Sequence, residues 1–233
     1  LAPPTVTLRR SAGDRWAIVV MAALLVVPAL GLVVGTVAVA RTSAGLAIFL
    51  GATAAFVSGL AYVVVNEARV RWTTRIALEP DGLHLTLPAR RGYVRQAPVR
   101  AVVPWPSVAG VETRSEAFRA IGTTVLQQAY ALRLADGGRI VLGADRRMVD
   151  PFFAGAAEAI AARARTTLVD RGMVDGDPGF LMIRGQAVPE WDASPLAPAA
   201  AATRTRQERR AWQLVGWAVL LTLAARALAA LLG

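Results

Sequence analysis

The stretch WAIVVMAALLVVPALGLVVGTVAVA, residues 16–40, decides the fold of this chain. It contains no charged side chain. A helix needs about 20 mostly apolar residues to cross the hydrocarbon core of a bilayer. Residues 44–65 have the same character, and residues 212–233 carry one charge, Arg226. We therefore predict three transmembrane helices.

The arginines around these spans predict a topology. They cluster in residues 9–15, 69–75 and 204–210, whereas the loop between the first two spans offers only Arg41. Basic residues are enriched on the cytoplasmic side of membrane proteins. We therefore predict a multi-pass protein of a bacterial inner membrane, with a cytoplasmic N-terminus and a periplasmic C-terminus. The region between the second and third spans is then cytoplasmic.

The composition argues against catalysis. The chain of 233 residues has a net charge of +10, no cysteine, one histidine, and arginine as its only basic residue apart from that histidine. Without cysteine and lysine, disulfides, thiol nucleophiles and the phosphate loop of nucleotide-binding enzymes are excluded. We attribute the basic excess to topology rather than to nucleic acid. We expect no enzyme activity, no cofactor, no metal and no small-molecule substrate.

Two β-hairpins are predicted between the second and third spans. Apolar residues alternate through 75–79 and 83–87, on either side of the turn residues Pro80-Asp81-Gly82. Residues 126–134 and 139–142 likewise flank the sequence Ala-Asp-Gly-Gly. Period-two alternation around such a turn is typical of a hairpin. Residues 102–111 predict a further strand, broken by its two prolines.

One amphipathic helix is predicted after these strands. Asp150 suits its N-cap and Pro151 its first position. A single apolar stripe recurs at three- and four-residue spacing: Phe152, Phe153, Ala156, Ala157, Ile160 and Ala161. Gly172 is predicted to lie at or just beyond the end of the helix. Strands followed by one helix predict a small α+β module, either a strongly bent sheet or an open barrel plugged by the helix.

This order of elements resembles the bacterial pleckstrin-homology-like domains, many of which follow a pair of transmembrane helices. The resemblance is carried by IALEPDGL at 76–83, VPWPSVAGV at 103–111, and the ADGG turn at 135–138 before the predicted helix. It covers roughly residues 70–170. It implies a binding or scaffolding module without conserved catalytic chemistry. The third span and the arginine-rich segment 88–98 depart from the family plan.

These interpretations predict an α+β membrane protein in five parts. They are an N-terminal cytoplasmic segment (1–15), a transmembrane helical hairpin (16–67), a pleckstrin-homology-like domain (68–172), a Pro/Ala-rich tether with a basic end (173–210) and a third transmembrane helix (211–233).

Two groups of residues are candidates for contact with a partner or with lipid. The first is a basic loop near the membrane surface, consisting of Arg90, Arg91, Tyr93, Arg95 and Arg100. Each arginine near an anionic leaflet contributes about 1 kcal/mol of attraction; the alternative is that the loop only maintains solubility and topology. The second is Arg226, because a charge inside a span costs roughly 2.5–3.5 kcal/mol. It either reaches the far head groups or pairs with another subunit.

Small residues at four-residue spacing mark faces where the first two helices can approach closely. They are Gly31, Gly35, Gly51, Ala55 and Gly59. We predict that they pack inside the hairpin; a homodimer face is the alternative.

We therefore expect a non-catalytic accessory or assembly subunit of a larger inner-membrane complex, whose partners are other membrane protein subunits and anionic lipids. The alternative is a lipid- or stress-sensing module that binds anionic head groups through the basic loop.

Overall fold

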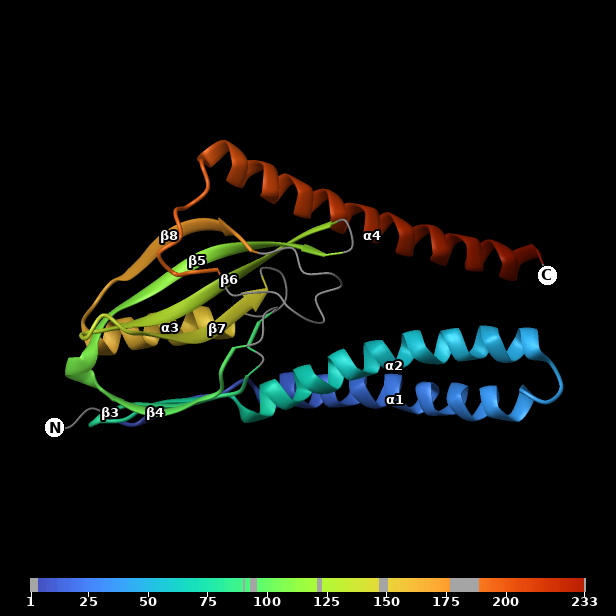
Figure 1. Ribbon diagram of the computed structural model, residues 1–233, viewed down its shortest axis with the longest axis horizontal. Helices are drawn as coiled ribbons and strands as arrows, with labels where there is room; N and C mark the ends of the chain where they lie inside the picture. The colour runs from blue at the N-terminus through green and yellow to red at the C-terminus, as the bar shows by residue number, and fades with distance from the viewer. Residues whose placement is uncertain are drawn as a thin grey trace. The chain divides into compact units, whose positions relative to one another are not determined.

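A computed structural model of the protein is shown in Figure 1. It describes residues 4–89, 91–92, 96–120, 123–146, 151–176 and 189–232, without the side chains of 120, 215, 218, 219 and 222–232. The chain forms two compact units. The first consists of residues 1–90 and 97–103, and the second of residues 91–96 and 104–233.

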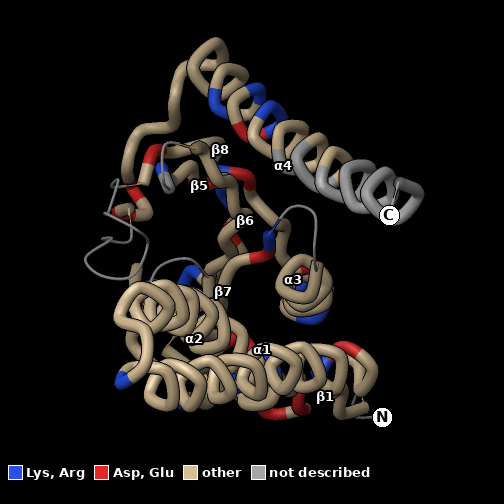
Figure 2. Tube along the Cα trace, turned by 90° about the vertical axis from the view of Figure 1, so that its right-hand side faces the viewer, with Lys and Arg blue, Asp and Glu red and all other residues tan. Residues whose placement is uncertain are grey.

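Two long helices form an antiparallel hairpin in the first unit (Figure 1). Helix α1 spans Ala12–Val39 and α2 spans Ala44–Thr73. Ser11 caps α1 by accepting the N–H of Asp14 at 3.0 Å. With 28 and 30 residues, the helices are about 42 and 45 Å long at 1.5 Å per residue. Figure 2 shows few charged residues along these two helices.

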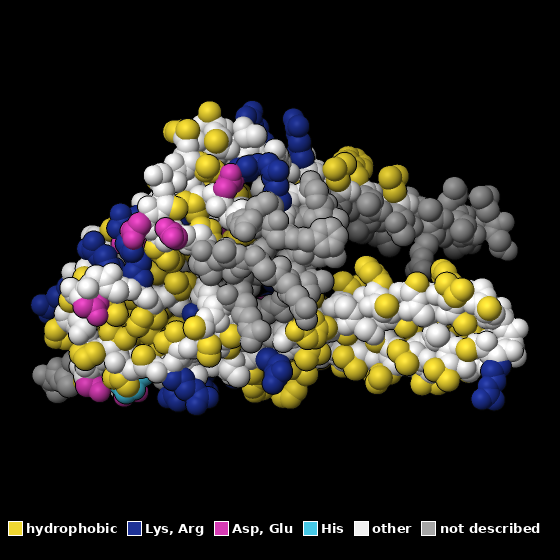
Figure 3. Space-filling view, viewed as in Figure 1, with side chains coloured by type: hydrophobic (Ala, Val, Ile, Leu, Met, Phe, Trp, Pro, Cys, Tyr) yellow, Lys and Arg dark blue, Asp and Glu magenta, His cyan; other side chains and the backbone are white. Residues whose placement is uncertain are grey.

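Both helices are long and apolar enough to cross a membrane, and in the described residues no other helix meets that test. A core helix of a soluble protein would bury its large side chains. Here Leu24, Ile48 and Phe49 are 68, 73 and 68% exposed. Hydrophobic side chains spread over the visible face of the hairpin in Figure 3. The predicted pair of apolar helices is thus confirmed.

Alanines form the seam between α1 and α2. Ala22 and Ala29 in α1, and Ala54, Ala61 and Ala68 in α2, are all buried. Their seven-residue spacing keeps them on one side of each helix, as in a coiled coil. Small side chains there let the two backbones approach closely.

The predicted glycine ridges contribute only partly to this seam. A Cβ atom on Gly35 would lie 3.9 Å from Leu50, and one on Gly51 would lie 3.5 Å from Thr36. Gly31 and Gly59 meet nothing within 4 Å, and Ala55 is exposed. The four-residue spacing therefore selected residues on more than one face of the helices, and it missed the buried alanines.

A four-stranded sheet lies at the base of the hairpin in the same unit. Its order is β1-β2-β3-β4, formed by Val6–Leu8, Arg75–Leu78, Gly82–Leu87 and Val99–Pro104. The predicted hairpin of β2 and β3 is confirmed. Strand β1 comes from the N-terminal segment, for which we predicted no strand. It pairs antiparallel with β2, so the chain entering α1 and the chain leaving α2 are joined.

The second unit contains another four-stranded sheet, ordered β7-β6-β5-β8. Its strands are β5 Val108–Ala120, β6 Thr123–Leu134, β7 Arg139–Arg146 and β8 Leu168–Asp175. The second predicted hairpin is confirmed as β6 and β7. Strand β8 pairs with β5 in parallel.

The predicted broken strand at residues 102–111 is instead two strands of different sheets. Strand β4 ends at Pro104, and β5 begins at Val108. A turn of 3-10 helix, Trp105–Ser107, separates them. Pro104 and Pro106 lack the N–H that a continuous ladder requires, so the chain leaves one sheet before it enters the next.

Helix α3, Phe152–Ala164, lies beside β7 and its sheet (Figure 2). The predicted stripe is confirmed except for Phe152, which is only half-buried; the buried residues are Phe153, Ala156, Ala157, Ile160 and Ala161. The carboxylate of Asp145 caps the helix by accepting the N–H groups of Phe153 and Ala154 at 3.0 and 2.7 Å. Asp150, the predicted cap, lies outside the described residues.

The predicted end of this helix was wrong. It ends at Ala164, where Arg165 adopts a left-handed conformation with φ 55°. Gly172 lies within β8 instead. The predicted tether at 173–210 also differs from the structure, because β8 continues to Asp175 and helix α4 begins at Pro198.

Helix α4, Pro198–Leu232, contains the predicted third span. Trp212, Leu214, Trp217 and Leu220 on this helix are exposed. The side chain of Arg226 lies outside the described residues. The third span therefore remains a prediction.

Candidate functional site

One face of β5 carries buried charges. Glu112, Arg114 and Glu116 alternate along the strand and therefore point to the same side of the sheet. Their exposed fractions are 2, 0 and 2%. Charged side chains are almost never buried to this degree unless they are paired. We therefore searched this face for the groups that pair with them.

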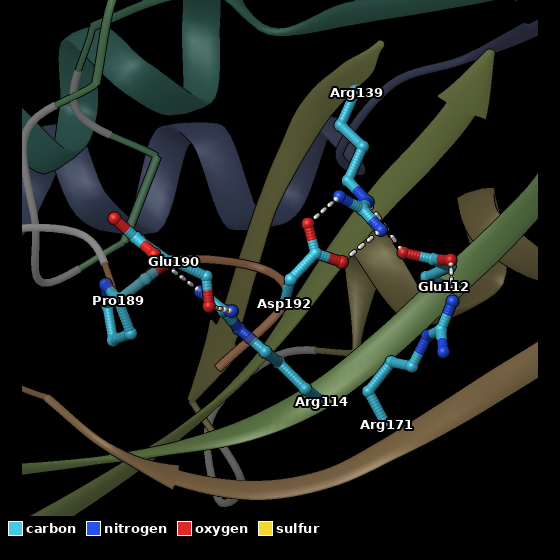
Figure 4. A network of polar contacts seen from close by, with 7 residues as sticks. All are labelled: Glu112, Arg114, Arg139, Arg171, Pro189, Glu190 and Asp192. Atoms are coloured by element: carbon cyan, nitrogen blue, oxygen red, sulfur yellow. Dashed lines mark hydrogen bonds and ion pairs between the residues drawn. The ribbon is translucent and has the colours of Figure 1, made fainter. Parts of the chain in front are cut away.

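Glu112 lies between two arginines that come from β7 and β8, on opposite sides of β5 in the sheet (Figure 4). Arg139 Nε on β7 donates to its carboxylate at 3.0 Å, and Arg171 Nη2 on β8 donates to the other oxygen. Arg139 also donates two hydrogen bonds to Asp192, at 2.8 and 2.7 Å. A chain of alternating charges thus joins three strands to residue 192.

Arg114 fixes the same segment at two further points. It donates two hydrogen bonds to one Glu116 oxygen, at 2.8 and 2.6 Å. It also donates to the carbonyl oxygens of Pro189 and Glu190, at 2.6 and 2.7 Å. Its guanidinium lies 4.1 Å from the centre of the Trp191 ring.

We call residues 189–197 the connecting segment, because they lead into α4. The β5 polar network is the group Glu112, Arg114, Glu116, Gln127, Arg139, Arg171 and Asp192; Gln127 belongs to it because its amide donates to Glu116 at 2.6 Å. The network clamps the start of the connecting segment onto the second sheet.

The end of the connecting segment is also attached to the second sheet. The N–H of Leu196 donates to the carbonyl of Met173 at 2.7 Å. Leu196 and Ala201 pack against a small apolar cluster, formed by Ala117, Leu126 and Met173. The connecting segment is therefore a packed part of the second unit and not a loose tether.

The first half of α4 is attached as well. Arg204 pairs with Asp175 of β8 through two hydrogen bonds, at 2.9 and 2.7 Å. Glu208 accepts the N–H of Leu126 at 3.1 Å. Among the described residues, Gln127 is the last β6 residue in register with β7, and Glu208 binds the next residue of β6, Leu126. The second sheet thus fixes the direction in which α4 leaves it.

The charges of the β5 polar network balance. Arg114, Arg139 and Arg171 are matched by three carboxylates, those of Glu112, Glu116 and Asp192. Burial alone would raise the pKa of Glu112, but hydrogen bonds and charges from Arg171 and Arg139 lower it overall. The hydrogen bond from Arg139 likewise lowers the pKa of Asp192. Carboxylates held ionised in this way suit a structural clamp better than a general acid.

We expect this clamp to weaken only in acid. A carboxyl whose pKa is lowered by folding stabilises the fold above its ordinary value, 4.5 for Glu112, and loses that contribution as the pH falls through the lowered pKa. Glu112→Gln should therefore be less stable than the wild type at pH 7, with a difference that shrinks below about pH 4. Denaturant unfolding of the full chain in mild detergent, repeated between pH 7 and pH 3, measures this.

The exposed Glu158 on α3 provides the control. Glu158→Gln should follow the wild-type curve. If the difference in stability between Glu112→Gln and the wild type stays constant from pH 7 to pH 3, the ionised carboxylate of Glu112 does not stabilise the clamp.

Two residues of the predicted basic loop, Arg91 and Arg100, are among the described residues. Arg91 is buried, and its Nη2 donates to the carbonyl of Val141 at 2.9 Å. Burial lowers the pKa of Arg91 to about 10. Its own carbonyl accepts the N–H of Ala144 at 2.7 Å, so Arg91 covers the outer edge of β7. Arg100, in β4, is exposed, whereas Arg90, Tyr93 and Arg95 lie outside the described residues.

Among the described residues, one group places three possible metal ligands together. His84 Nε2 lies 3.4 Å from a carboxylate oxygen of Asp81 and 3.7 Å from one of Glu79. Glu79 and Asp81 lie in the turn between β2 and β3, and His84 lies in β3; Asp81 is largely exposed. In the described residues nothing else there points to a ligand, so we interpret the group as a polar cluster at the surface.

No protein-family model matches the chain, and neither does any curated protein or solved structure. The function is therefore inferred from the residues of the chain itself.

Proposed function

We propose that the chain is a non-catalytic accessory or assembly subunit of a larger inner-membrane protein complex. In this proposal α1, α2 and the apolar end of α4 dock on partner helices. The sheets face the cytoplasm and the C-terminus is periplasmic. The partners are other membrane protein subunits.

One observation carries this proposal: the β5 polar network uses buried charges to attach the connecting segment. Burying ion pairs costs several kcal/mol per ion in desolvation, and their attraction offsets that cost only when the geometry is good. A flexible tether would need no such arrangement. A domain that must present α4 in one direction to a partner would need it.

The finer description of the fold is also part of the proposal. A pleckstrin-homology-like plan is supported by one sheet that contains β2, β3 and β4, a second, antiparallel sheet of β5, β6 and β7, and a helix, α3, after them. Strands β1 and β8 are additions to that plan. The resemblance implies a surface for recognition rather than for bond-making.

The size of the detergent-solubilised protein tests this proposal. Expressed at its native level and extracted in mild detergent, the chain should migrate well above its own mass of 24.6 kDa and carry other membrane proteins with it. A chain shortened to residues 1–210 should lose the partners that dock on α4 while the second sheet stays folded, because only the apolar end of α4 is removed. A lone monomer at native expression would rule out the complex.

The two hypotheses for Arg226 can be separated in the same experiment. If Arg226 pairs with another subunit, Arg226→Leu should release that subunit, because a partner carboxylate would be left without its counter-charge in the membrane. If Arg226 reaches the far head groups, the complex should stay intact. Arg41→Leu in the loop between α1 and α2 is the matched control.

The alternative, a lipid- or stress-sensing module, requires basic side chains that reach head groups. The described part of the basic loop supplies only Arg100 for this, because Arg91 is buried. A different part of the chain offers a better arrangement for lipid.

A further inference from the structure

We infer that the base of the α1–α2 hairpin binds the phosphate of an anionic phospholipid through Arg15, Trp16 and Trp72. This inference rests on the insertion of α1 and α2 in a membrane, but not on a complex with other proteins.

Two tryptophans lie together at the base of the hairpin. Trp16 is in the first turns of α1 and Trp72 in the last turn of α2, so the antiparallel helices bring them to the same end. Their ring centres are 5.7 Å apart and their planes are nearly perpendicular, at 88°. Trp16 is 59% exposed and Trp72 is 45% exposed. Exposed indoles are enriched where a transmembrane helix meets the head groups.

Arg15 completes the group. Its guanidinium carbon lies 4.7 Å from the centre of the Trp72 ring, a cation–π distance. The Nε atom is shielded from solvent and has no hydrogen-bond acceptor among the described residues. A donor that is shielded from water and has no acceptor is destabilising. At this level of a membrane, phosphate oxygens are abundant acceptors, and the planar guanidinium suits them geometrically.

The surrounding charges favour an anionic lipid over a zwitterionic one. Asp14 is engaged by the hydroxyl of the capping serine at 2.6 Å, and Glu67 pairs with Arg71 at 3.1 Å. Arg69 and Arg75 at the same end of the hairpin are exposed. The base of the hairpin is therefore positively charged overall, and net negative head groups are attracted to it.

Lipid retention by the full chain tests this site. The protein is placed in nanodiscs that contain equal amounts of phosphatidylglycerol and phosphatidylcholine with the same acyl chains. Native mass spectrometry then gives the ratio of the two lipids that remain bound. We expect the wild type to prefer phosphatidylglycerol and Arg15→Gln to reduce that preference about fivefold, the factor that corresponds to about 1 kcal/mol per arginine.

Three further variants make the result specific. Arg41→Gln, at the opposite end of the hairpin, should leave the ratio unchanged. Arg15→Lys keeps the charge but loses the planar fork, and Trp72→Phe weakens the cation–π contact; both should give intermediate ratios. Arg15→Lys also keeps the test valid if Arg15→Gln fails to fold.

Two outcomes would overturn the inference. The first is an equal lipid ratio in the wild type and in Arg15→Gln. The second is a wild type that retains no lipid in the nanodisc but, in a separate experiment in its native membrane, cross-links at residue 15 to another protein, which would give the arginine a partner's carboxylate instead of a phosphate. Because the nanodisc holds the chain alone, failure here is distinguishable from failure of the proposed complex.

Discussion

Arg114→Ala should lower the free energy of unfolding by roughly 3–5 kcal/mol, the cost of removing one partner from a buried ion pair. The Arg114 side chain is 0% exposed and donates four hydrogen bonds. Among the described residues, its loss leaves the buried carboxylate of Glu116 with the amide of Gln127 as its one side-chain donor. Denaturant unfolding of the full chain in mild detergent measures the change.

Arg119 provides the matched control for this variant. It lies on the same strand but is exposed, so Arg119→Ala should change the stability by less than about 0.5 kcal/mol. Arg114→Ala should also release the connecting segment, seen as faster hydrogen exchange at the amide of Leu196. If both arginine variants unfold at the same denaturant concentration, the clamp contributes nothing and the proposed role of the β5 polar network fails.

A double variant separates stability from specificity. Replacing a buried ion pair by apolar residues of similar volume is often neutral or stabilising. Arg114→Met with Glu116→Leu should therefore recover much of the stability that Arg114→Ala loses. The carbonyls of Pro189 and Glu190 would still lack a donor, so we expect the connecting segment to remain more mobile than in the wild type.

The parts of the fold that depend on neighbouring residues could be predicted from the sequence. The turns Pro80-Asp81-Gly82 and Asp136-Gly137-Gly138 specify hairpins because their backbone conformations are local properties. The apolar stripe of α3 and the long apolar helices depend on periodicity and length within one segment. None of these needs information from a distant part of the chain.

The β5 polar network could not be predicted in this way. The sequence Glu-Thr-Arg-Ser-Glu at 112–116 has the composition of an exposed strand. Its burial depends on carbonyl groups 75 and 76 residues away from Arg114. The alternation of opposite charges on one face of the strand was the available signal, but exposed strands carry the same pattern, so it does not by itself indicate burial.

Tertiary pairing also explains the other differences. Strand β1 has three residues and exists because β2 offers an edge to it. Arg91 was grouped with its basic neighbours by sequence, but the open edge of β7 takes both its side chain and its backbone carbonyl. Asp145 caps α3 from β7. In each case the partner lies on another element.

Gly143→Ala should destabilise the second unit by roughly 2–5 kcal/mol, through overpacking and backbone strain together. Gly143 lies at an irregularity in the pairing of β6 and β7 and has φ +156°. A Cβ atom there would lie 2.3 Å from Cζ of Phe153, which α3 holds at 1% exposure. Because Phe153 is almost fully buried, its ring cannot move away without displacing its neighbours, so we expect β7 and α3 to be pushed apart.

Gly155→Ala on α3 is the control, because a Cβ atom there meets nothing within 4 Å. Alanine in an exposed helix position should stabilise by up to about 1 kcal/mol, so two glycine-to-alanine changes should have opposite signs. Phe153→Ala alone should cost about 3–5 kcal/mol. If the clash causes the effect of Gly143→Ala, the double variant must cost less than the sum of the two single variants, with a coupling of about 0.5–3 kcal/mol. If the two effects are strictly additive, a clash between the new Cβ atom and Phe153 is not the cause of the loss of stability in Gly143→Ala.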